Sequence, residues 1–295
     1  MEKTRLVASL PDMSTTTRAL QAIFPAKGTL EGAGVKLHRG FGYYELPKFD
    51  PFLLFDDFSS PQPADYLAGF PWHPHRGIET VTYVLEGNVA HQDSLGHAGT
   101  ISNGAVQWMS AGKGIIHQEM PQGLRGLKGF QLWVNLPKQH KMSAPQYQEF
   151  RANEIPAIAF GPHAQVKVIA GQITNQVGPV HDIAAQPLFV DVQLKANQTL
   201  DFPVVSGHTV FLYVFEGNVG LDDSGVVSAP TRQVLLLEPH RDLVHVKAGS
   251  SDARFLLVSG QPLNEPIAWN GPIVMNTAEE LEEAFQQLQS GVFIS

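Results

Sequence analysis

Four residues in two short motifs have the types and the spacing of metal ligands. The motif FPWHPH places His73 and His75 two positions apart, and the motif IIHQE does the same for His117 and Glu119. Alternate residues of a β-strand project from the same face, so each motif presents a pair of ligands to one space. Two such strands side by side would offer three imidazoles and one carboxylate to a divalent transition-metal ion. This donor set suits Fe(II), Mn, Ni, Cu or Zn and leaves positions open for water or substrate.

A second carboxylate competes with Glu119 for the fourth ligand position. Glu79 has the same strand parity as His73 and His75, and the spacing alone leaves both carboxylates open. Pro74 stands between the two histidines and cannot donate a ladder hydrogen bond, which suits a strand at the edge of a sheet.

The elements that must position these residues are predicted to be short strands. Apolar runs broken by Gly, Pro, Asn or Asp recur from about residue 35 to residue 260. Their lengths favour strands, and the residues between them favour tight turns. The clearest runs are Thr80–Leu85, Val106–Met109, Phe130–Leu136, Val166–Ile169, Leu188–Leu194, Thr209–Phe215, Val234–Leu237 and Phe255–Val258.

One segment, Thr277–Gln289, predicts a helix instead. Thr277 is a suitable N-cap residue, and Glu280 follows at the position of its capping-box partner. Leu281, Ala284, Phe285 and Leu288 form one apolar stripe, which favours packing against a barrel. The chain is therefore predicted to be all-β with a short C-terminal helix.

An internal repeat indicates two copies of one β-domain. IETVTYVLEGNVAHQDS at Ile78–Ser94 recurs as HTVFLYVFEGNVGLDDS at His208–Ser224, a shift of 130 residues. Each copy predicts a strand, a Glu-Gly-Asn turn and a returning strand. The shift places His73 on Pro203 and His75 on Val205, and only His245 lies roughly opposite His117. We therefore expect one metal ion per chain, in the first domain.

Composition excludes several classes of partner. The net charge is −8 and no cluster of Lys or Arg occurs, which argues against direct binding of nucleic acid or of a membrane surface. With no cysteine, thiolate zinc sites, iron–sulfur clusters and disulfides are excluded. No segment approaches the roughly 20 apolar residues of a membrane span, and the first residues lack a signal-peptide core. A cytoplasmic protein is the expectation.

The motifs together resemble the pirin family of the cupin superfamily. His73-Pro-His75-Arg-Gly-Ile-Glu79, Gly112-Lys-Gly114-Ile-Ile-His117-Gln-Glu119 and Gln131-Leu-Trp133-Val-Asn135-Leu-Pro137 carry the resemblance, with Glu265-Pro266 and Gly271-Pro-Ile-Val-Met-Asn276 near the end. It implies a bicupin, with a metal-binding barrel at residues 15–150 and a metal-free barrel at 151–295 that ends in the helix at about 277–289.

The resemblance also implies a ligand set. Carried over by position, the ligands are His73, His75, His117 and Glu119, and Fe(II) is the favoured ion. Glu79 is then placed beside the ligands and not on the metal.

Other residues invite a functional interpretation that we do not favour. Ala111-Gly-Lys113-Gly matches only part of a phosphate-binding loop and predicts a turn. Aromatic residues on strands most often pack in cores, and histidines in turns are often exposed. The remaining candidates are Trp108, Trp133 and Phe130 for stacking a planar substrate, His91 and His97 for orienting a ligand imidazole, and Asp56 and Asp57 for the pocket mouth.

Two functions from different classes follow from the resemblance. The first is a dioxygenase that opens quercetin-type flavonols with O2 and releases carbon monoxide, with Glu119 as the catalytic base and with Trp108, Ile115 and Phe52 beside the flat substrate. The second is a regulatory protein whose metal redox state controls docking to a transcription factor or a metabolic enzyme. A metal-binding cupin with a different substrate is a third reading, because fold and ligand set do not determine the substrate.

Overall fold

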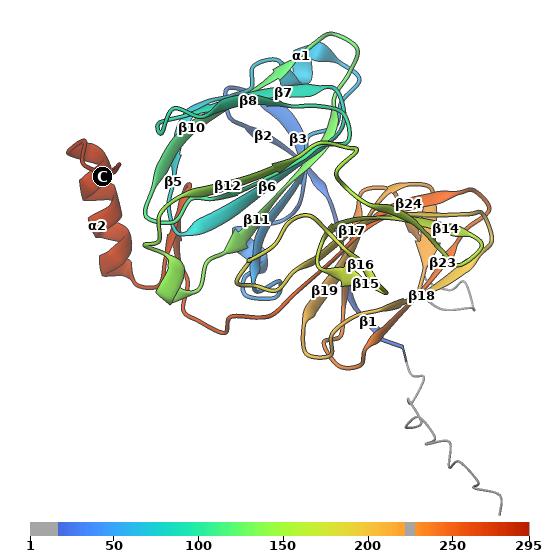
Figure 1. Cartoon of the computed structure of the whole chain (residues 1–295). Coiled ribbons are helices and arrows are strands. Elements are labelled where there is room, and N and C mark those ends of the chain that lie inside the picture. The colour runs from blue at the N-terminus through green and yellow to red at the C-terminus, as the bar shows by residue number, and fades with distance from the viewer. Residues whose placement is uncertain (1–16, 222–227, 295) are drawn as a thin grey trace, which may run out of the picture.

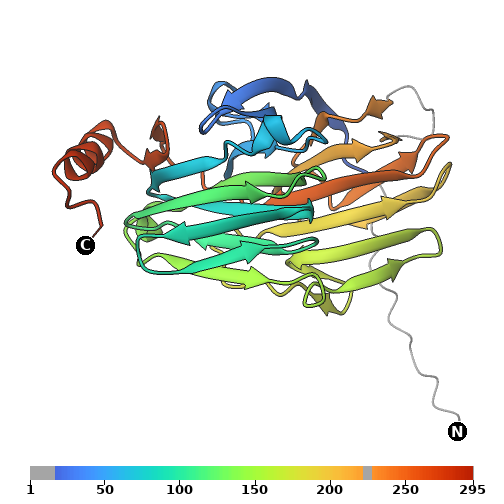
Figure 2. The same cartoon turned by 90° about the horizontal axis from the view of Figure 1, so that it is seen from above.

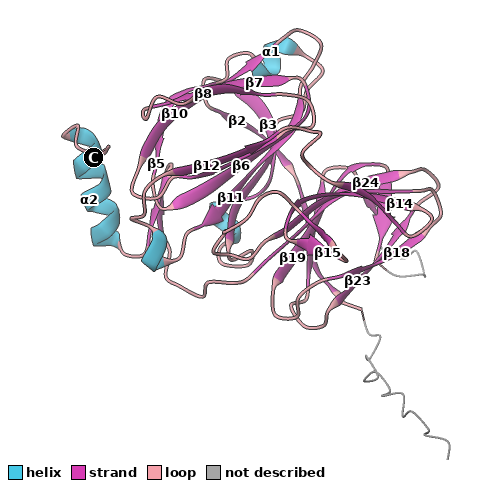
Figure 3. Ribbon diagram, in the orientation of Figure 1, coloured by secondary structure: helices cyan, strands magenta, loops and turns pink. Residues whose placement is uncertain are grey.

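The computed structural model describes residues 17–221 and 228–294 as two antiparallel β-barrels followed by a helix (Figures 1 and 3). The predicted all-β fold with a short C-terminal helix is confirmed. Residues 15, 16, 222–227 and 295 of the predicted domain ranges, which include the last three residues of the repeat, lie outside the described residues. No helix among the described residues is long and apolar enough to cross a membrane.

The first barrel consists of two sheets that face one another. The larger sheet has the strand order β12-β9-β6-β11-β4-β3-β2, and the smaller has the order β5-β10-β7-β8. The strands are β2 (Lys27–Glu31), β3 (Val35–Phe41), β4 (Phe52–Asp57), β5 (Phe70–His75), β6 (Ile78–Glu86), β7 (Asn88–Asp93), β8 (Ala98–Ile101), β9 (Val106–Ser110), β10 (Ile115–Gln122), β11 (Lys128–Asn135) and β12 (Gln146–Phe150). Short helices lie at Tyr43–Glu45, Pro63–Tyr66 (α1) and Lys138–His140.

The second barrel repeats this plan. Its larger sheet has the order β1-β22-β19-β24-β17-β14-β13 and its smaller sheet the order β18-β23-β20-β21. The strands are β1 (Leu20–Pro25), β13 (Ala157–Phe160), β14 (Ala164–Ala170), β17 (Leu188–Leu194), β18 (Thr199–Pro203), β19 (Thr209–Glu216), β20 (Asn218–Gly220), β21 (Ala229–Pro230), β22 (Gln233–Leu237), β23 (Leu243–Ala248) and β24 (Ala253–Gly260). Two ribbons stand apart, β15 (Gln172–Ile173) with β16 (Gln176–Val177) and β25 (Ala268–Asn270) with β26 (Ile273–Met275).

Each end of the described chain crosses to the other barrel. Strand β1 pairs with β22 and so extends the sheet of the second barrel, although residues 15–150 were predicted to belong to the first. The helix α2 (Ala278–Gln289), with which the predicted second domain ends, packs beside the first barrel (Figure 2). Its buried Ala284 shares a cluster with Ile116 of β10. These contacts join residues more than 150 positions apart, so local sequence patterns could not predict them.

The repeat is visible in both barrels as the hairpins β6–β7 and β19–β20. Gly87 and Gly217 turn them with φ values of 95° and 70°, which favour glycine. The tyrosines of the repeat bind reciprocally across the barrel interface. Tyr83 donates to Asp191 at 2.8 Å, and Tyr213 donates to Asp57 at 2.7 Å.

Two apolar cores follow from this arrangement. One lies between the barrels, where the large sheets pack their outer faces together through residues such as Phe55, Phe130 and Phe211. The other fills the interior of the second barrel, with Phe202, Val244 and their neighbours. In the first barrel a smaller apolar cluster around Phe58 and Val84 occupies part of the interior, and polar residues occupy another part.

Candidate metal centre

The two predicted ligand motifs lie on neighbouring strands. β5 is the edge strand of the small sheet, as Pro74 predicts, and pairs with β10 so that His73 stands opposite His117. Ligand nitrogens of His73, His75 and His117 all lie within 4.8 Å of one another. The two strands therefore bring three imidazoles together, as their i, i+2 spacing predicts.

The hydrogen bonds of His73 and His75 direct two lone pairs at one point. Nδ1 of His73 lies 2.9 Å from the carbonyl of Pro71, and Nδ1 of His75 lies 3.2 Å from the carbonyl of Pro272. A carbonyl only accepts, so in the neutral rings each Nδ1 carries the hydrogen and each Nε2 is bare. The two Nε2 atoms are 3.1 Å apart. Ligands bound at about 2.1 Å and at a right angle would be about 3.0 Å apart, so this pair fits a shared cation.

The buried imidazoles of His75 and His117 are held neutral, the form that binds metal. Burial lowers the pKa of His75 well below its ordinary value, and the neighbouring His73 and His117 lower it further. Burial also lowers the pKa of His117, to about 4. Both ring nitrogens of His117 are buried and have no hydrogen-bond partner among the described residues. An ion would satisfy one of these nitrogens, so the residues present fit a metal.

Glu119 lies on the same inward face of β10 as His117, and it is buried. Burial by itself would raise the pKa of Glu119, but His117 and His73 and two hydrogen bonds bring it below its ordinary value. Thr82 Oγ1 donates to Oε1 at 2.9 Å, and Gln131 Nε2 donates to Oε2 at 3.0 Å. Glu119 is not part of the group within 4.8 Å, and its role as fourth ligand stays a prediction.

Sequence reasoning missed Thr82 and Gln131. Strand alternation held a signal for Gln131, because it lies two positions before Trp133, a residue already considered for the site. Thr82 offered no comparable signal because β6 is buried on both faces.

Glu79 faces away from the histidines. Thr82 of β6 points to Glu119, so Glu79, at odd spacing from Thr82, lies on the opposite face of the strand. Its Oε2 accepts a hydrogen bond from Trp108 Nε1 at 3.1 Å. The predicted place beside the ligands is wrong because the chain does not run straight from β5 into β6. Gly77, with φ of 75°, interrupts the strand and resets its alternation.

Of the aromatic residues considered for substrate stacking, Trp133 alone faces the cavity beside the site. Its ring centroid is 5.1 Å from that of His75. Trp108, Phe130 and Phe52 pack in the core between the barrels, where both faces of the large sheet are covered. Ile115 packs in a small cluster with Met109 and Ala111. The predicted contacts of Trp108, Ile115 and Phe52 with a substrate are therefore wrong.

A cavity of about 830 Å³ opens at His73 and His75. Its aromatic wall includes Tyr43, Trp72, Trp133 and Trp269. Trp269 lies 6.0 Å from Trp133 and 5.6 Å from Tyr43, measured between ring centroids. Asp56, considered from the sequence for the pocket mouth but not favoured there, also lines this cavity. Arg39 donates two hydrogen bonds to Asp56, of 2.9 and 2.8 Å. Sequence reasoning missed Trp269, which arrives from the other end of the chain.

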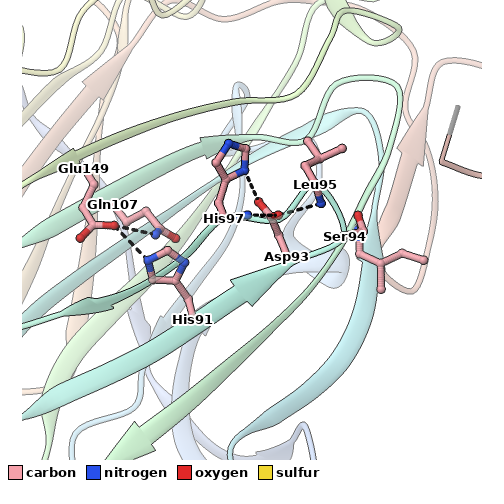
Figure 4. A network of polar contacts seen from close by, with 8 residues as sticks. His91, Asp93, Ser94, Leu95, His97, Gln107 and Glu149 are labelled. Atoms are coloured by element: carbon pink, nitrogen blue, oxygen red, sulfur yellow. Dashed lines mark hydrogen bonds and ion pairs between the residues drawn. The ribbon is translucent and has the colours of Figure 1, made fainter.

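The two histidines considered for orienting a ligand imidazole, His91 and His97, bind acids instead (Figure 4). His91 Nε2 lies 3.0 Å from Glu149, whose same oxygen accepts from Gln107 at 3.2 Å. His97 Nδ1 lies 2.8 Å from Asp93. His91 is nevertheless the cross-strand partner of Glu119, so these hydrogen bonds of His91 lie next to the proposed metal site.

Three further candidates have structural roles. Asp57 accepts the hydroxyl of Tyr213 and belongs to the barrel interface. Lys113 lies in a turn between β9 and β10, as predicted. His245 of the second barrel lies on β23 opposite Asp201 and binds that carboxylate at 2.6 Å. The residues that alternate with it, Val244 and Val246, fill the barrel interior, so His245 has no place like that of His117.

Comparison with known proteins gives a consistent result. The family model described as Pirin matches residues 34–134, and the model described as Pirin C-terminal cupin domain matches residues 189–294. The chain is 46% identical over 278 residues to a pirin-like protein of Caulobacter vibrioides, covering 94% of this chain and 99% of that one. It is 42% identical over 258 residues to pirin of Rattus norvegicus, covering 86% of each chain. A crystal structure of quercetin 2,3-dioxygenase from Acinetobacter baumannii matches with a TM-score of 0.86 and 34% identity, covering 95% of this chain and 99% of that chain.

Proposed function

Because the chain belongs to the pirin family and has its two cupin barrels, we propose that it is a metal-dependent dioxygenase that cleaves quercetin-type flavonols with O2. The observation that carries the proposal is a three-histidine cluster at one side of an aromatic-walled cavity of about 830 Å³. This volume lies within the range of about 300–1,000 Å³ that is typical of small-molecule sites. The similarity to a structure described as quercetin 2,3-dioxygenase supports the same substrate class.

The metal is proposed to be one divalent transition-metal ion per chain, held by His73, His75, His117 and Glu119, with Fe(II) favoured over Cu, Ni, Mn or Zn. Such an ion supplies Lewis acidity toward a hydroxy-ketone and a route for electrons toward oxygen. The neutral imidazoles of His75 and His117 and the ionised Glu119 can bind such an ion without prior loss of protons.

The chain's own residues bind and orient the substrate. Trp133 and Trp269 offer faces against which a planar ring system can lie. Glu119 is proposed to take the proton of the flavonol hydroxyl as general base, because its lowered pKa keeps it ionised at neutral pH. Thr82 and Gln131 hold both of its oxygens in place for that transfer.

The test is turnover after anaerobic reconstitution with Fe(II). Addition of quercetin and O2 should remove the flavonol's absorbance and release carbon monoxide, and His73→Ala should abolish both. Turnover that survives His73→Ala would refute the site. Glu119→Gln separates the two roles of that residue: retained metal with a large fall in kcat supports the base, whereas loss of metal supports the ligand alone.

A regulatory role, in which the metal's redox state controls docking to a protein partner, stays a prediction, as does a cytoplasmic location. Affinity capture with ferrous, ferric and metal-free protein tests the regulatory role. Identical partner sets for the three forms would contradict it.

A further inference from the structure

The C-terminal segment crosses from the second barrel to the metal site of the first. After β24 the chain forms the ribbon β25–β26 and then α2, which lies beside the first barrel (Figure 1). We propose that residues 268–294, which we name the strap, position His75 as a metal ligand and complete the cavity wall. The inference rests on the metal site of the proposed function but not on its flavonol chemistry.

The first contact sets the tautomer of His75. The carbonyl of Pro272, in the turn between β25 and β26, lies 3.2 Å from Nδ1 of His75. This acceptor keeps the hydrogen on Nδ1 and the lone pair on Nε2, the atom that faces His73. Gly271, with φ of 54°, gives this turn its shape. The orientation of His75 in the first barrel therefore depends on the carbonyl of Pro272, which comes after the last strand of the second barrel in the chain.

Arg76 and Gly77, which follow His75 in the loop between β5 and β6, contact the same ribbon. Arg76 forms a parallel bridge with Ile273, and its carbonyl accepts from the Val274 amide at 3.1 Å. Lys141 is buried and donates from Nζ to the carbonyls of Val274 and Gly77, each at 2.9 Å. A Cβ added to Gly77 would clash with the Val274 carbonyl oxygen. The loop and the ribbon are thus in direct backbone contact, with no room for a side chain between them.

The end of the strap holds the side chain of Arg76. Arg76 donates to Gln287 of α2 at 2.8 Å and to the carbonyl of Phe293 at 3.0 Å. Its guanidinium carbon lies 4.2 Å from the centroid of the Phe293 ring, which is buried. Arg76 is the neighbour of His75, so a displaced helix would release the loop next to the ligand.

The same strap closes one side of the cavity. Trp269, Asn270, Gly271 and Pro272 all line it. Trp269 donates from Nε1 to the carbonyl of Gly271 at 2.7 Å, which ties its ring to the turn that contacts His75. One short segment thus both orients a ligand and supplies an aromatic wall. The arrangement makes the strap a positioning element for the metal and a contact surface for the substrate.

The test is a titration of metal-free, full-length protein with Co(II), whose visible spectrum reports the ligand geometry. Phe293→Ala should weaken Co(II) affinity by roughly tenfold or more, the range found when groups that orient ligands are removed, and should shift the Co(II) bands. Val292→Ala changes the exposed neighbour in the same tail and should leave both unchanged.

A milder pair of variants keeps the test valid if Phe293→Ala fails to fold. Gln287→Ala removes one acceptor of Arg76 and should lower Co(II) affinity in the same direction, whereas Gln286→Ala removes an exposed bond within the helix and should not. If both Phe293→Ala and Gln287→Ala bind Co(II) with wild-type affinity and wild-type absorption bands, the proposed positioning role of the strap is overturned. Failure of the wild-type protein to bind Co(II) would overturn the metal site itself, and the strap with it.

Discussion

The hydroxyl of Tyr213 should contribute more to stability than the equivalent hydroxyl of Tyr83. Both tyrosines are fully buried, and each donates to an aspartate across the barrel interface. Their acceptors differ. Asp191 also accepts two hydrogen bonds from Arg254, at 2.9 and 2.6 Å. The Asp57 oxygen that accepts from Tyr213 has no other donor among the described residues, and the second oxygen accepts only from the Ser59 amide.

This difference sets the expected magnitudes. Tyr213→Phe keeps the ring and leaves a buried carboxylate oxygen without a donor, which costs about 2–3 kcal/mol in the free energy of unfolding. Tyr83→Phe leaves Asp191 held by a bidentate guanidinium and should cost about 1 kcal/mol. Both substitutions leave the aromatic packing in place, so the hydrogen bond is the quantity compared.

Urea unfolding followed by far-UV circular dichroism measures both losses, because strands of both barrels contribute to the signal. Tyr44→Phe is the control, since the side chain of Tyr44 is 93% exposed and should contribute nothing measurable. A loss in Tyr83→Phe as large as that in Tyr213→Phe would refute the reasoning from unsatisfied acceptors.

Three further variants test other parts of the structure. Burial raises the pKa of Glu79 to about 7, so the folded protein binds this proton more tightly than the unfolded chain does. Relative to Glu79→Gln, the free energy of unfolding of the wild type should therefore fall by about 3 kcal/mol as pH rises from about 4.5 to about 7. A difference in urea unfolding that does not change with pH would contradict this. Gly77→Ala should lower the free energy of unfolding by more than about 3 kcal/mol, because the added Cβ meets a carbonyl of the strap. Gly96→Ala is the control: Gly96 also has a positive φ but has open space around it, so the loss should be about 1 kcal/mol. Equal losses in urea unfolding would argue against the clash. Gln131→Leu removes a donor to Glu119 and should weaken Ni(II) affinity roughly tenfold in a direct titration; unchanged affinity would show that this hydrogen bond does not hold the carboxylate.

The sequence was informative where structure is local. The pairs His73 with His75 and His117 with Glu119 each lie within one strand, so alternation alone places each pair on a common face. The pairing of the two strands was an expectation that the described register confirms. The capping box of α2 is equally local, and Thr277 and Glu280 form it as predicted.

The errors arose where alternation is interrupted or where both faces of a strand are buried. Gly77 separates Glu79 from the histidines, so counting along the chain assigned Glu79 to the wrong face. Trp108 and Trp133 lie on strands of a sheet that is covered on both sides, and hydrophobicity does not distinguish the barrel interior from the barrel interface. The strap could not be foreseen, because its contacts with Arg76 join residues about 200 positions apart.

The two barrels differ in what fills their interiors: the first carries the histidine cluster, and the second has an apolar core. Buried imidazoles and carboxylates replace apolar packing and need partners, which makes a polar interior costly to fold. The second barrel has no such cost at the corresponding strand, because Val244 and Val246 fill its interior. The core between the large sheets then joins this apolar barrel to the one that carries His117. Loss of the ligands from the second copy is therefore consistent with a role as support for the first, and the strap extends that support to the metal site.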